Sequence, residues 1–244
     1  MLTIIYASLF YLGTAVLVGG LAKHIYIYAR TPAPLKIPTM PAPTTQTGVV
    51  LRMAREVVFF ESLFKSNKWI WLFGWLFHVS MALVLLRHLR YFTEPVWAVI
   101  SIIQPIGLYA GFGMLAGLLA LWARRIVVPR VRYISGPSDH LMLILLLAIV
   151  ISGFFMQYVE RVDILAVKAF MLGLMSFNIQ PMPDSPILML HLGLVAALMI
   201  IFPFSKLLHA PGVFFSPTRN QVDNARDKRH LAPWAKALDT KRGR

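Results

Sequence analysis

The chain has 244 residues, of which 58% are hydrophobic and only 14% are charged. This composition excludes an ordinary soluble domain and indicates a polytopic membrane protein. The sequence contains no cysteine, which excludes disulfides, cysteine-bound iron–sulfur clusters and haem attached through a C-x-x-C-H motif. The apolar segments are long and continuous rather than alternating, so they predict helices and not strands.

Five apolar segments are each long enough to cross a hydrocarbon core of about 30 Å. We expect spanning helices at residues 3–28, 69–91, 96–123, 140–159 and 187–208. The positive residues of the first segment follow its apolar stretch, which is the reverse of the order in a cleaved signal peptide. The sequence therefore predicts an all-α membrane protein, with a five-helix bundle over residues 1–210 and a basic tail over 211–244.

The net charge of +14 is unevenly distributed along the chain. Of the 24 Lys and Arg, 20 lie before the second predicted helix, between the third and fourth, or from Lys206 at the end of the fifth onward. The remaining four are Arg87, Arg90, Arg161 and Lys168. Because Lys and Arg accumulate in cytoplasmic loops, we expect the N-terminus outside and the C-terminus in the cytoplasm. Membrane topology accounts for the charge, and we expect no nucleic-acid partner.

The predicted cytoplasmic stretch at 29–68 has two parts. Five prolines between residues 32 and 43 predict an extended spacer. Residues 49–65 then predict an amphipathic helix, because the following apolar side chains share one face: Val50, Met53, Val57, Phe60 and Phe64. Such a helix lies on the bilayer surface or docks a cytoplasmic partner, and the two are compatible.

Two further segments lie outside the predicted spans. The loop at 160–185 is apolar but too interrupted to span, so we expect it at the outer interface, over the ends of the second and fifth helices. The chain after Pro211 is polar and basic, and we expect it to be loosely ordered unless a partner holds it.

Four histidines lie in two of the predicted spanning helices: His78 and His88 in the second, His191 and His209 in the fifth. An ionisable side chain inside a spanning helix is costly and is a functional candidate by default. Two on each of two helices is the arrangement that holds two haems, each bound by one histidine from either helix. The two helices run in opposite directions, so depth pairs His78 with His209 on the inner side and His88 with His191 on the outer side.

The two histidine spacings differ. His191 and His209 are about 27 Å apart on an ideal helix axis, and His78 and His88 about 15 Å. We expect helix tilt, side-chain reach and a kink at Pro203 to absorb the difference. A single membrane histidine is more often a packing residue than a ligand, but four at matching depths favour ligation. One zinc or copper ion is the rival, although its ligands must converge within about 2 Å, which such distant pairs cannot do.

Two arginine pairs accompany the histidines. Arg87 and Arg90 flank His88, and Arg124 and Arg125 end the third predicted helix. All four are candidate partners of haem propionates, which are anionic and need partners near the membrane surface. The alternatives are interfacial anchoring for the first pair and plain positive-inside bias for the second. No ligand role is expected for the three other histidines: His24, His140 and His230.

These motifs resemble the gamma subunit of respiratory nitrate reductase, a five-helix dihaem cytochrome b. They are F-H-x9-H at residues 77–88, L-H-L at 190–192 followed by F-P-F-S-K at 202–206 and His209, and R-R-x3-P-R-V-R at 124–132. Each motif alone is weak, but the set, in order and at this spacing, is specific. The resemblance implies the same pairing of ligands, and a quinone that reacts on the outer side near the outer haem.

One branch of this superfamily looks closer. The proline-rich spacer, F-F-E-S-L-F-K-S-N-K-W-I-W-L-F-G-W-L-F-H at 59–78 and L-R-H-L-R-Y-F at 86–92 are similar to the DsrM-type cytochrome b subunit of the Dsr transmembrane complex, which is associated with dissimilatory sulfite reductase. There the cytochrome joins a cytoplasmic iron–sulfur subunit resembling heterodisulfide reductase, a second membrane subunit, and periplasmic cytochrome c and iron–sulfur subunits. The resemblance implies partners of these kinds.

One departure concerns the quinone. Nitrate reductase gamma subunits have a lysine near the start of the third helix that helps to bind quinone. The corresponding stretch, 96–108, offers only Ser101 and Gln104 as polar side chains. Gln104 is therefore our candidate quinone contact, and the alternative is a helix-packing residue beside Pro105.

We therefore expect a multi-pass subunit of the cytoplasmic membrane that holds two b-type haems. It would transfer electrons between menaquinone or ubiquinone and a cytoplasmic iron–sulfur partner, in dissimilatory sulfur metabolism, as a redox subunit that is not catalytic alone. Two alternatives remain open. The first is the gamma subunit of a nitrate reductase or another haem b membrane anchor, and the second is a non-redox scaffold or transporter, which would bind no haem.

Overall fold

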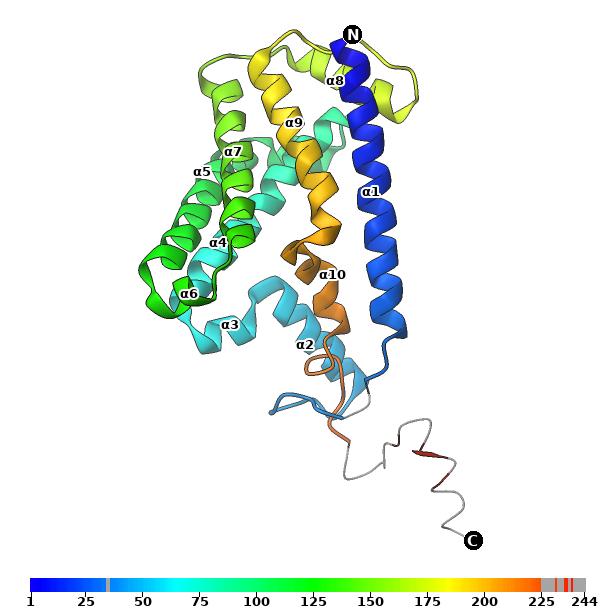
Figure 1. Cartoon of the computed structure of the whole chain (residues 1–244), viewed down its shortest axis with the longest axis vertical. Coiled ribbons are helices and arrows are strands. Elements are labelled where there is room, and N and C mark those ends of the chain that lie inside the picture. Colours follow the sequence, from blue (N-terminus) through cyan, green and yellow to red (C-terminus); the bar gives the residue numbers. More distant parts are fainter. Residues whose placement is uncertain (34–35, 225–230, 232–234, 237, 239–244) are drawn as a thin grey trace. The chain divides into compact units, whose positions relative to one another are not determined.

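The computed structural model describes residues 1–33, 36–224, 231, 235, 236 and 238. The regular secondary structure of these residues consists of helices, with no strand among them (Figure 1). The chain forms two compact units. Unit 1 comprises residues 1–17 and 63–201, and unit 2 comprises residues 18–62 and 202–244.

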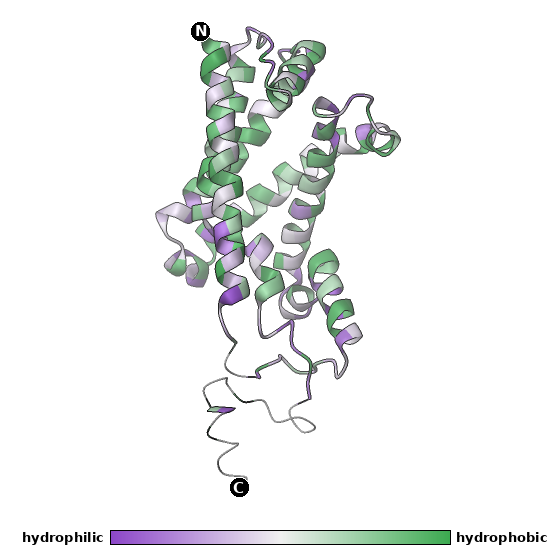
Figure 2. Ribbon diagram, turned by 90° about the vertical axis from the view of Figure 1, so that its right-hand side faces the viewer, coloured by the Kyte–Doolittle hydropathy of each residue, from purple (hydrophilic) through white to green (hydrophobic). Residues whose placement is uncertain are grey.

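Five helices among the described residues are long and apolar enough to cross a membrane. They are α1 (Leu2–Arg30), α4 (Lys68–His88) with its 3-10 turn η1 (Leu89–Tyr91), α5 (Ala98–Val127), α7 (Pro137–Tyr158), and α9 (Pro186–Ile201) with its 3-10 turn η2 (Phe202–Phe204). Figure 2 shows these helices as predominantly hydrophobic. Each coincides with one predicted segment, which confirms the all-α class and the five spans.

In unit 1, α5 lies against α4 and α7, and α7 lies against α9 (Figure 1). Glycines bring α5 close to α4: a Cβ on Gly117 would lie 2.9 Å from Cβ of Phe77, and one on Gly107 would lie 2.9 Å from Cβ of Arg87. In a membrane, such close approach of backbones supplies the packing that holds helices together. Buried apolar side chains then join α4, α5 and α7: Phe77, Met114, Leu118, Leu146, Leu147 and Val150.

The predicted outer loop contains a short apolar helix, α8 (Ile164–Met175), whose first turn is capped by Asp163. Phe170 of α8 is fully buried, in a cluster that includes Leu188 and Leu192 of α9 and against which Tyr91 of η1 packs. The loop therefore covers the ends of α4 and α9, as predicted. The hydroxyl of Tyr11 on α1 donates to the carbonyl oxygen of Leu174 at 2.9 Å and joins α1 to the same cluster.

The predicted amphipathic helix at 49–65 is two helices, α2 (Gln46–Phe59) and α3 (Glu61–Ser66). Phe60 lies between them in the left-handed region, with φ of 51°, and this conformation ends α2. The apolar face of α2 is turned outward, because Val50 is 66% exposed while Arg52 is only 7% exposed. Of the predicted face, Phe64 belongs to α3 and not to α2.

The predicted fifth helix is also not continuous to residue 208. Regular α-helix ends at Ile201, and η2, a second 3-10 turn η3 (Lys206–Leu208), α10 (His209–Gly212) and η4 (Val213–Phe215) follow. Pro203 has no N–H to continue the helix, so the chain leaves the α-helix at this proline instead of continuing, kinked, to residue 208 as predicted. In unit 2 the proline ring lies on α1, where a Cβ on Gly20 would come within 2.4 Å of it.

The chain after Pro211 is better ordered than expected. Backbone hydrogen bonds join it to the proline-rich spacer, from Thr39 N to Thr218 O at 2.9 Å and from Asp223 N to Pro43 O at 2.8 Å. Arg219 forms an ion pair with Glu56 of α2 at 3.2 Å. The expectation of loose order is therefore wrong for residues 211–223. Most of the predicted basic tail from residue 225 onward lies outside the described residues.

Candidate functional site

His88 occupies the last turn of α4 and is exposed. Its Nδ1 atom lies 2.7 Å from the carbonyl oxygen of Val84, one turn earlier in the same helix. A carbonyl oxygen only accepts, so Nδ1 carries the proton and donates it. The lone pair of the ring is then on Nε2, the nitrogen at the far side of the ring from the backbone.

His191 on α9 is held from the neighbouring helix. Its Nδ1 atom lies 2.9 Å from Oγ of Ser152 on α7, and Ser152 is only 3% exposed. The serine hydroxyl donates its own hydrogen to the carbonyl oxygen of Ile149 at 3.0 Å, so Oγ accepts from Nδ1 of His191. His191 therefore has the same tautomer as His88.

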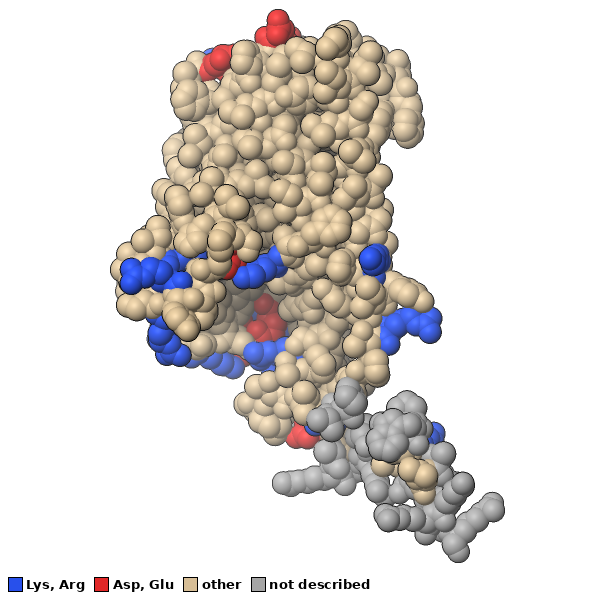
Figure 3. Space-filling view, in the orientation of Figure 1, with Lys and Arg blue, Asp and Glu red and all other residues tan. Residues whose placement is uncertain are grey.

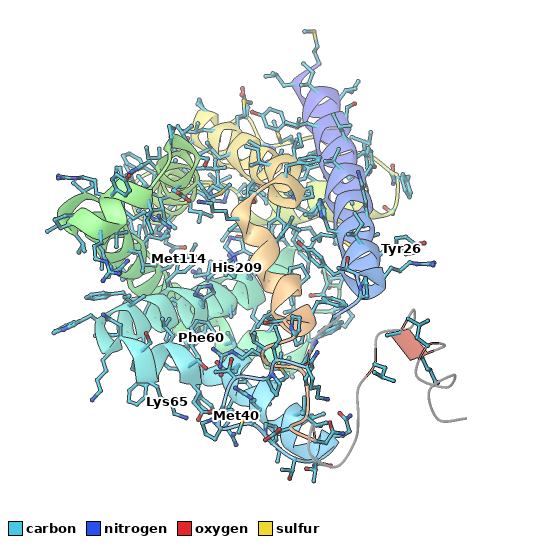
Figure 4. The ribbon with its side chains drawn as sticks, turned by 60° about the horizontal axis from the view of Figure 1, so that its bottom comes forward. Tyr26, Met40, Phe60, Lys65, Met114 and His209 are labelled. Atoms are coloured by element: carbon cyan, nitrogen blue, oxygen red, sulfur yellow. The ribbon has the colours of Figure 1, made fainter. Side chains whose placement is uncertain are left out.

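The two predicted inner ligands have the same local arrangement, each within its own unit. In unit 1, Nδ1 of His78 donates to the carbonyl oxygen of Gly74 at 2.7 Å. In unit 2, Nδ1 of His209 donates to the carbonyl oxygen of Lys206 at 2.8 Å, at the start of α10 (Figure 4). The pairing of these two histidines stays a prediction from their depth in the sequence.

All four predicted ligands therefore donate Nδ1–H to an oxygen and have the lone pair on Nε2. Metal-binding histidines show this arrangement, because the second hydrogen bond sets the tautomer and the orientation of the ring. His140 provides an internal contrast: its Nδ1 accepts from Nε1 of Trp122 at 3.1 Å, which gives the opposite tautomer. His24 packs near Tyr28, and His230 lies outside the described residues.

Beside His88, polar side chains of α4 with η1, α5 and α7 form a group that we call the arginine cluster: Arg87, Arg90, Tyr91, Gln104 and Gln157. Oε1 of Gln104 accepts from Nε of Arg87 and from a terminal nitrogen of Arg90, each at 3.2 Å. Arg87 also donates to Oε1 of Gln157 at 3.2 Å, and Arg90 to the hydroxyl of Tyr91 at 2.8 Å. The structure thus joins both arginines of the outer candidate pair.

Gln104, the candidate quinone contact, lies inside this cluster. Both polar atoms of its amide form hydrogen bonds, because Nε2 also donates to the backbone carbonyl of Arg87 at 3.2 Å. The helix-packing alternative thus has direct support in the α4–α5 contact. A quinone contact by Gln104 stays a prediction.

The inner arginine pair, Arg124 and Arg125, ends α5. Arg125 donates to Oγ of Ser135 at 3.1 Å and lies 3.8 Å from the carboxylate of Asp139. Asp139 in turn accepts from the backbone N–H of Gly136 at 3.1 Å, at the beginning of α7. Arg125 therefore has a partner that stabilises the α5–α7 connection, and its propionate role is untested.

Two residues of the site were missed by sequence reasoning. Ser152 is the one polar side chain between His140 and Gln157 on α7, and an isolated hydroxyl in an apolar helix is a usable signal. Gln157 is the next polar residue of that helix, at the end where the outer loop begins. Neither could be assigned a partner without the packing of α7 against α4 and α9.

A family model described as the nitrate reductase gamma subunit matches residues 46–224. The chain belongs to this family. Two Hdr-like menaquinol oxidoreductase cytochrome b-like subunits are similar to it. That of Archaeoglobus fulgidus is 39% identical, over 92% of this chain and 81% of the relative. That of Archaeoglobus profundus is 33% identical, over 94% and 82%.

These similarities confirm the predicted family and agree with the predicted DsrM-type branch. Family membership and the five spanning helices together make the chain a multi-pass membrane protein.

Proposed function

We propose that the chain is the membrane cytochrome b subunit of a menaquinol-oxidising complex and holds two b-type haems. The observation that carries this proposal is the shared tautomer of His78, His88, His191 and His209, each with Nδ1–H donated to an oxygen. A membrane scaffold or transporter has no need of this arrangement at four separate positions.

The donor set fits haem b. His88 and His191 would bind the outer haem iron through Nε2, and the depth argument assigns His78 and His209 to the inner haem. Two imidazoles leave no open position on the iron, which favours electron transfer over reaction with oxygen. When bound, the haems would supply the one-electron redox chemistry of the subunit.

The side chains of the protein would orient the imidazole ligands and neutralise the haem carboxylates. Val84 and Ser152 set the direction of the two outer imidazoles, and the close α4–α5 packing sets the position of α4. Arg87 and Arg90 would balance the carboxylates of the outer haem, and Arg124 and Arg125 are the corresponding candidates for the inner one.

The relatives' names favour menaquinone over ubiquinone as the exchangeable substrate. We place the reaction of the quinol near His88 and His191, with the N-terminus outside the cytoplasmic membrane and the C-terminus inside. The subunit would act only within its complex, in dissimilatory sulfur metabolism, and is not an enzyme alone.

The proposed electron acceptor is a cytoplasmic iron–sulfur subunit resembling heterodisulfide reductase. Figure 3 shows Lys and Arg gathered at the end of unit 1 around α6 (Pro129–Ile134), while the rest of unit 1 shows few charged side chains on this face. The basic residues of this end are Lys65, Lys68, Arg124, Arg125, Arg130 and Arg132. They suit an acidic partner surface. A second membrane subunit and periplasmic cytochrome c and iron–sulfur subunits would complete the complex.

A pyridine haemochrome assay on the detergent-purified protein tests the proposal. We expect about two b haems per chain, and the loss of one in each of His88→Ala and His209→Ala. His140→Ala, a histidine of the opposite tautomer, is the matched control and should keep both. A folded protein without haem would overturn the proposal and favour a scaffold or transporter.

A further inference from the structure

We propose that Gln104 positions Arg87 and Arg90 as a binding site for the carboxylates of the outer haem. This inference rests on the proposed function, because it takes the haem between His88 and His191 as given. It assigns Gln104 a positioning role in place of a quinone contact.

The first step is the shared acceptor. Two guanidinium groups donate to one amide oxygen, Oε1 of Gln104, each at 3.2 Å. Like charges at this separation repel each other, and an uncharged amide cannot neutralise them. The arrangement therefore brings two positive charges together at a cost that something else must offset.

The second step is the missing counter-charge. No carboxylate of the described residues forms an ion pair with Arg87 or Arg90. Nε of Arg90 is buried and has no hydrogen-bond partner among them. Charged groups inside a protein are normally paired, and a buried guanidinium nitrogen without an acceptor is rare. An anion that is not part of the described chain would neutralise the two positive charges and accept a hydrogen bond from Nε of Arg90.

The third step is the position of the cluster. Arg87 precedes His88 directly, and Arg90 is two residues beyond it, so both charges lie at the predicted outer ligand. The neutral side chains limit how far the arginines can move: Gln157 holds Arg87 from α7, and the ring of Tyr91 lies 4.9 Å from the guanidinium carbon of Arg90. The two carboxylates carried by a b haem match two fixed guanidinium groups in number and charge.

Gln104→Glu separates this role from simple packing. A glutamate keeps the two hydrogen bonds from the guanidinium groups but loses the one that Nε2 donates to the carbonyl oxygen of Arg87. Its negative charge neutralises the two arginines, so it competes with the haem carboxylates. We would measure the midpoint potential of each b haem by spectroscopic redox titration of the purified full-length holoprotein, together with haem retention and thermal stability. We would also combine Gln104→Glu with His209→Ala. That variant is expected to retain only the outer haem, so any shift in its midpoint potential belongs to the outer haem.

We expect Gln104→Glu to lower the midpoint potential of the outer haem, to weaken its retention and to leave the inner haem unchanged. A lower potential follows because uncompensated carboxylates stabilise ferric iron. Gln104→Leu, which releases the arginines, should shift the outer haem in the same direction. Gln180→Leu is the matched control, since Gln180 lies in the loop after α8 and its side chain donates to the backbone carbonyl of Asn178 at 3.2 Å.

Three results would overturn the inference. The first is a more stable Gln104→Glu protein with both potentials unchanged, which would show that the cluster only packs the helices. The second is a shift that appears only when anionic phospholipid is added to lipid-free detergent, which would identify the anion as a lipid phosphate. The third is a folded wild-type protein without haem, which would overturn the proposed function as well.

Discussion

Nδ1 of His191 on α9 donates a hydrogen bond to Oγ of Ser152 on α7 at 2.9 Å. The serine hydroxyl in turn donates a hydrogen bond to the carbonyl oxygen of Ile149. Among the four candidate ligands, Nδ1 of His191 is hydrogen-bonded to a side chain of another helix. The other three histidines donate Nδ1–H to backbone carbonyl oxygens at most four residues away. The orientation of this ring therefore depends on the packing of two helices and is open to a single substitution.

Replacing Ser152 by alanine should weaken the outer haem selectively. Without the acceptor, the ring of His191 loses its fixed tautomer and orientation, and changes of this kind typically cost about 10- to 100-fold in metal affinity. Haem content and the reduced-minus-oxidised spectrum would show loss of one haem on dilution. Ser176→Ala is the control, because that exposed serine also donates to a backbone carbonyl but directly follows α8, away from the histidines of α4 and α9. Equal loss of both haems would contradict the prediction.

Gly153 should tolerate alanine but not a large side chain. An added Cβ would lie 3.6 Å from Cε1 of His191, which is ordinary contact, whereas further atoms would push into the ring. We expect Gly153→Ala to retain two haems and Gly153→Leu to lose the outer one. The matched control is Gly19→Leu, where an added Cβ meets nothing within 4 Å. Retention of both haems in Gly153→Leu would show that the ring is not confined from this side.

Much of this architecture follows from local patterns in the sequence. Length and hydropathy locate the five spans, and the break after Ile201 follows from the missing N–H of Pro203. The candidate ligands are also local signals, since imidazoles are conspicuous in apolar helices. The structure adds their common tautomer, which no pattern encodes, because it depends on where each Nδ1 atom finds an oxygen.

Other features depend on contacts between distant residues and could not be predicted. The partners of Gln104 depend on the α4–α5 register, which Gly107 sets by close approach to Arg87. The order of residues 211–223 comes from hydrogen bonds to a spacer more than 170 residues earlier in the chain, such as Thr39 to Thr218. The amphipathic helix is interrupted at Phe60, and phenylalanine rarely adopts a positive φ. The residue type at this position therefore did not predict the interruption.

Substituting Gly117 should disturb both haems at once. Even the Cβ of alanine would lie 2.9 Å from Phe77 Cβ and 3.0 Å from the carbonyl oxygen of Phe73, so α4 and α5 must separate. Overpacking of this kind typically costs about 1–3 kcal/mol. Because α4 carries one ligand of each proposed haem, thermal unfolding followed at the Soret band should shift downward for both. Gly19→Ala provides the control on an open helix face, and an unchanged unfolding temperature in Gly117→Ala would contradict the close packing.

The Glu56–Arg219 pair should hold the segment after α10 in place. Glu56 is 12% exposed at its side chain, pairs with Arg219 at 3.2 Å and accepts from the backbone N–H of Ser62 at 3.1 Å. Glu56→Ala leaves both partners unsatisfied, which we expect to cost about 1–3 kcal/mol. Limited proteolysis should then cleave residues 213–224 faster.

The comparison for this prediction is Glu61→Ala, which removes the more exposed pair with Arg55 at 2.7 Å. Exposed pairs of this kind contribute about 0–1 kcal/mol, so proteolysis of this variant should stay close to that of the wild type. Equal protection of residues 213–224 in all three proteins would show that the backbone hydrogen bonds to the spacer hold the segment without the ion pair. Faster cleavage in Glu56→Ala alone would show that a charge on α2 keeps the segment in position.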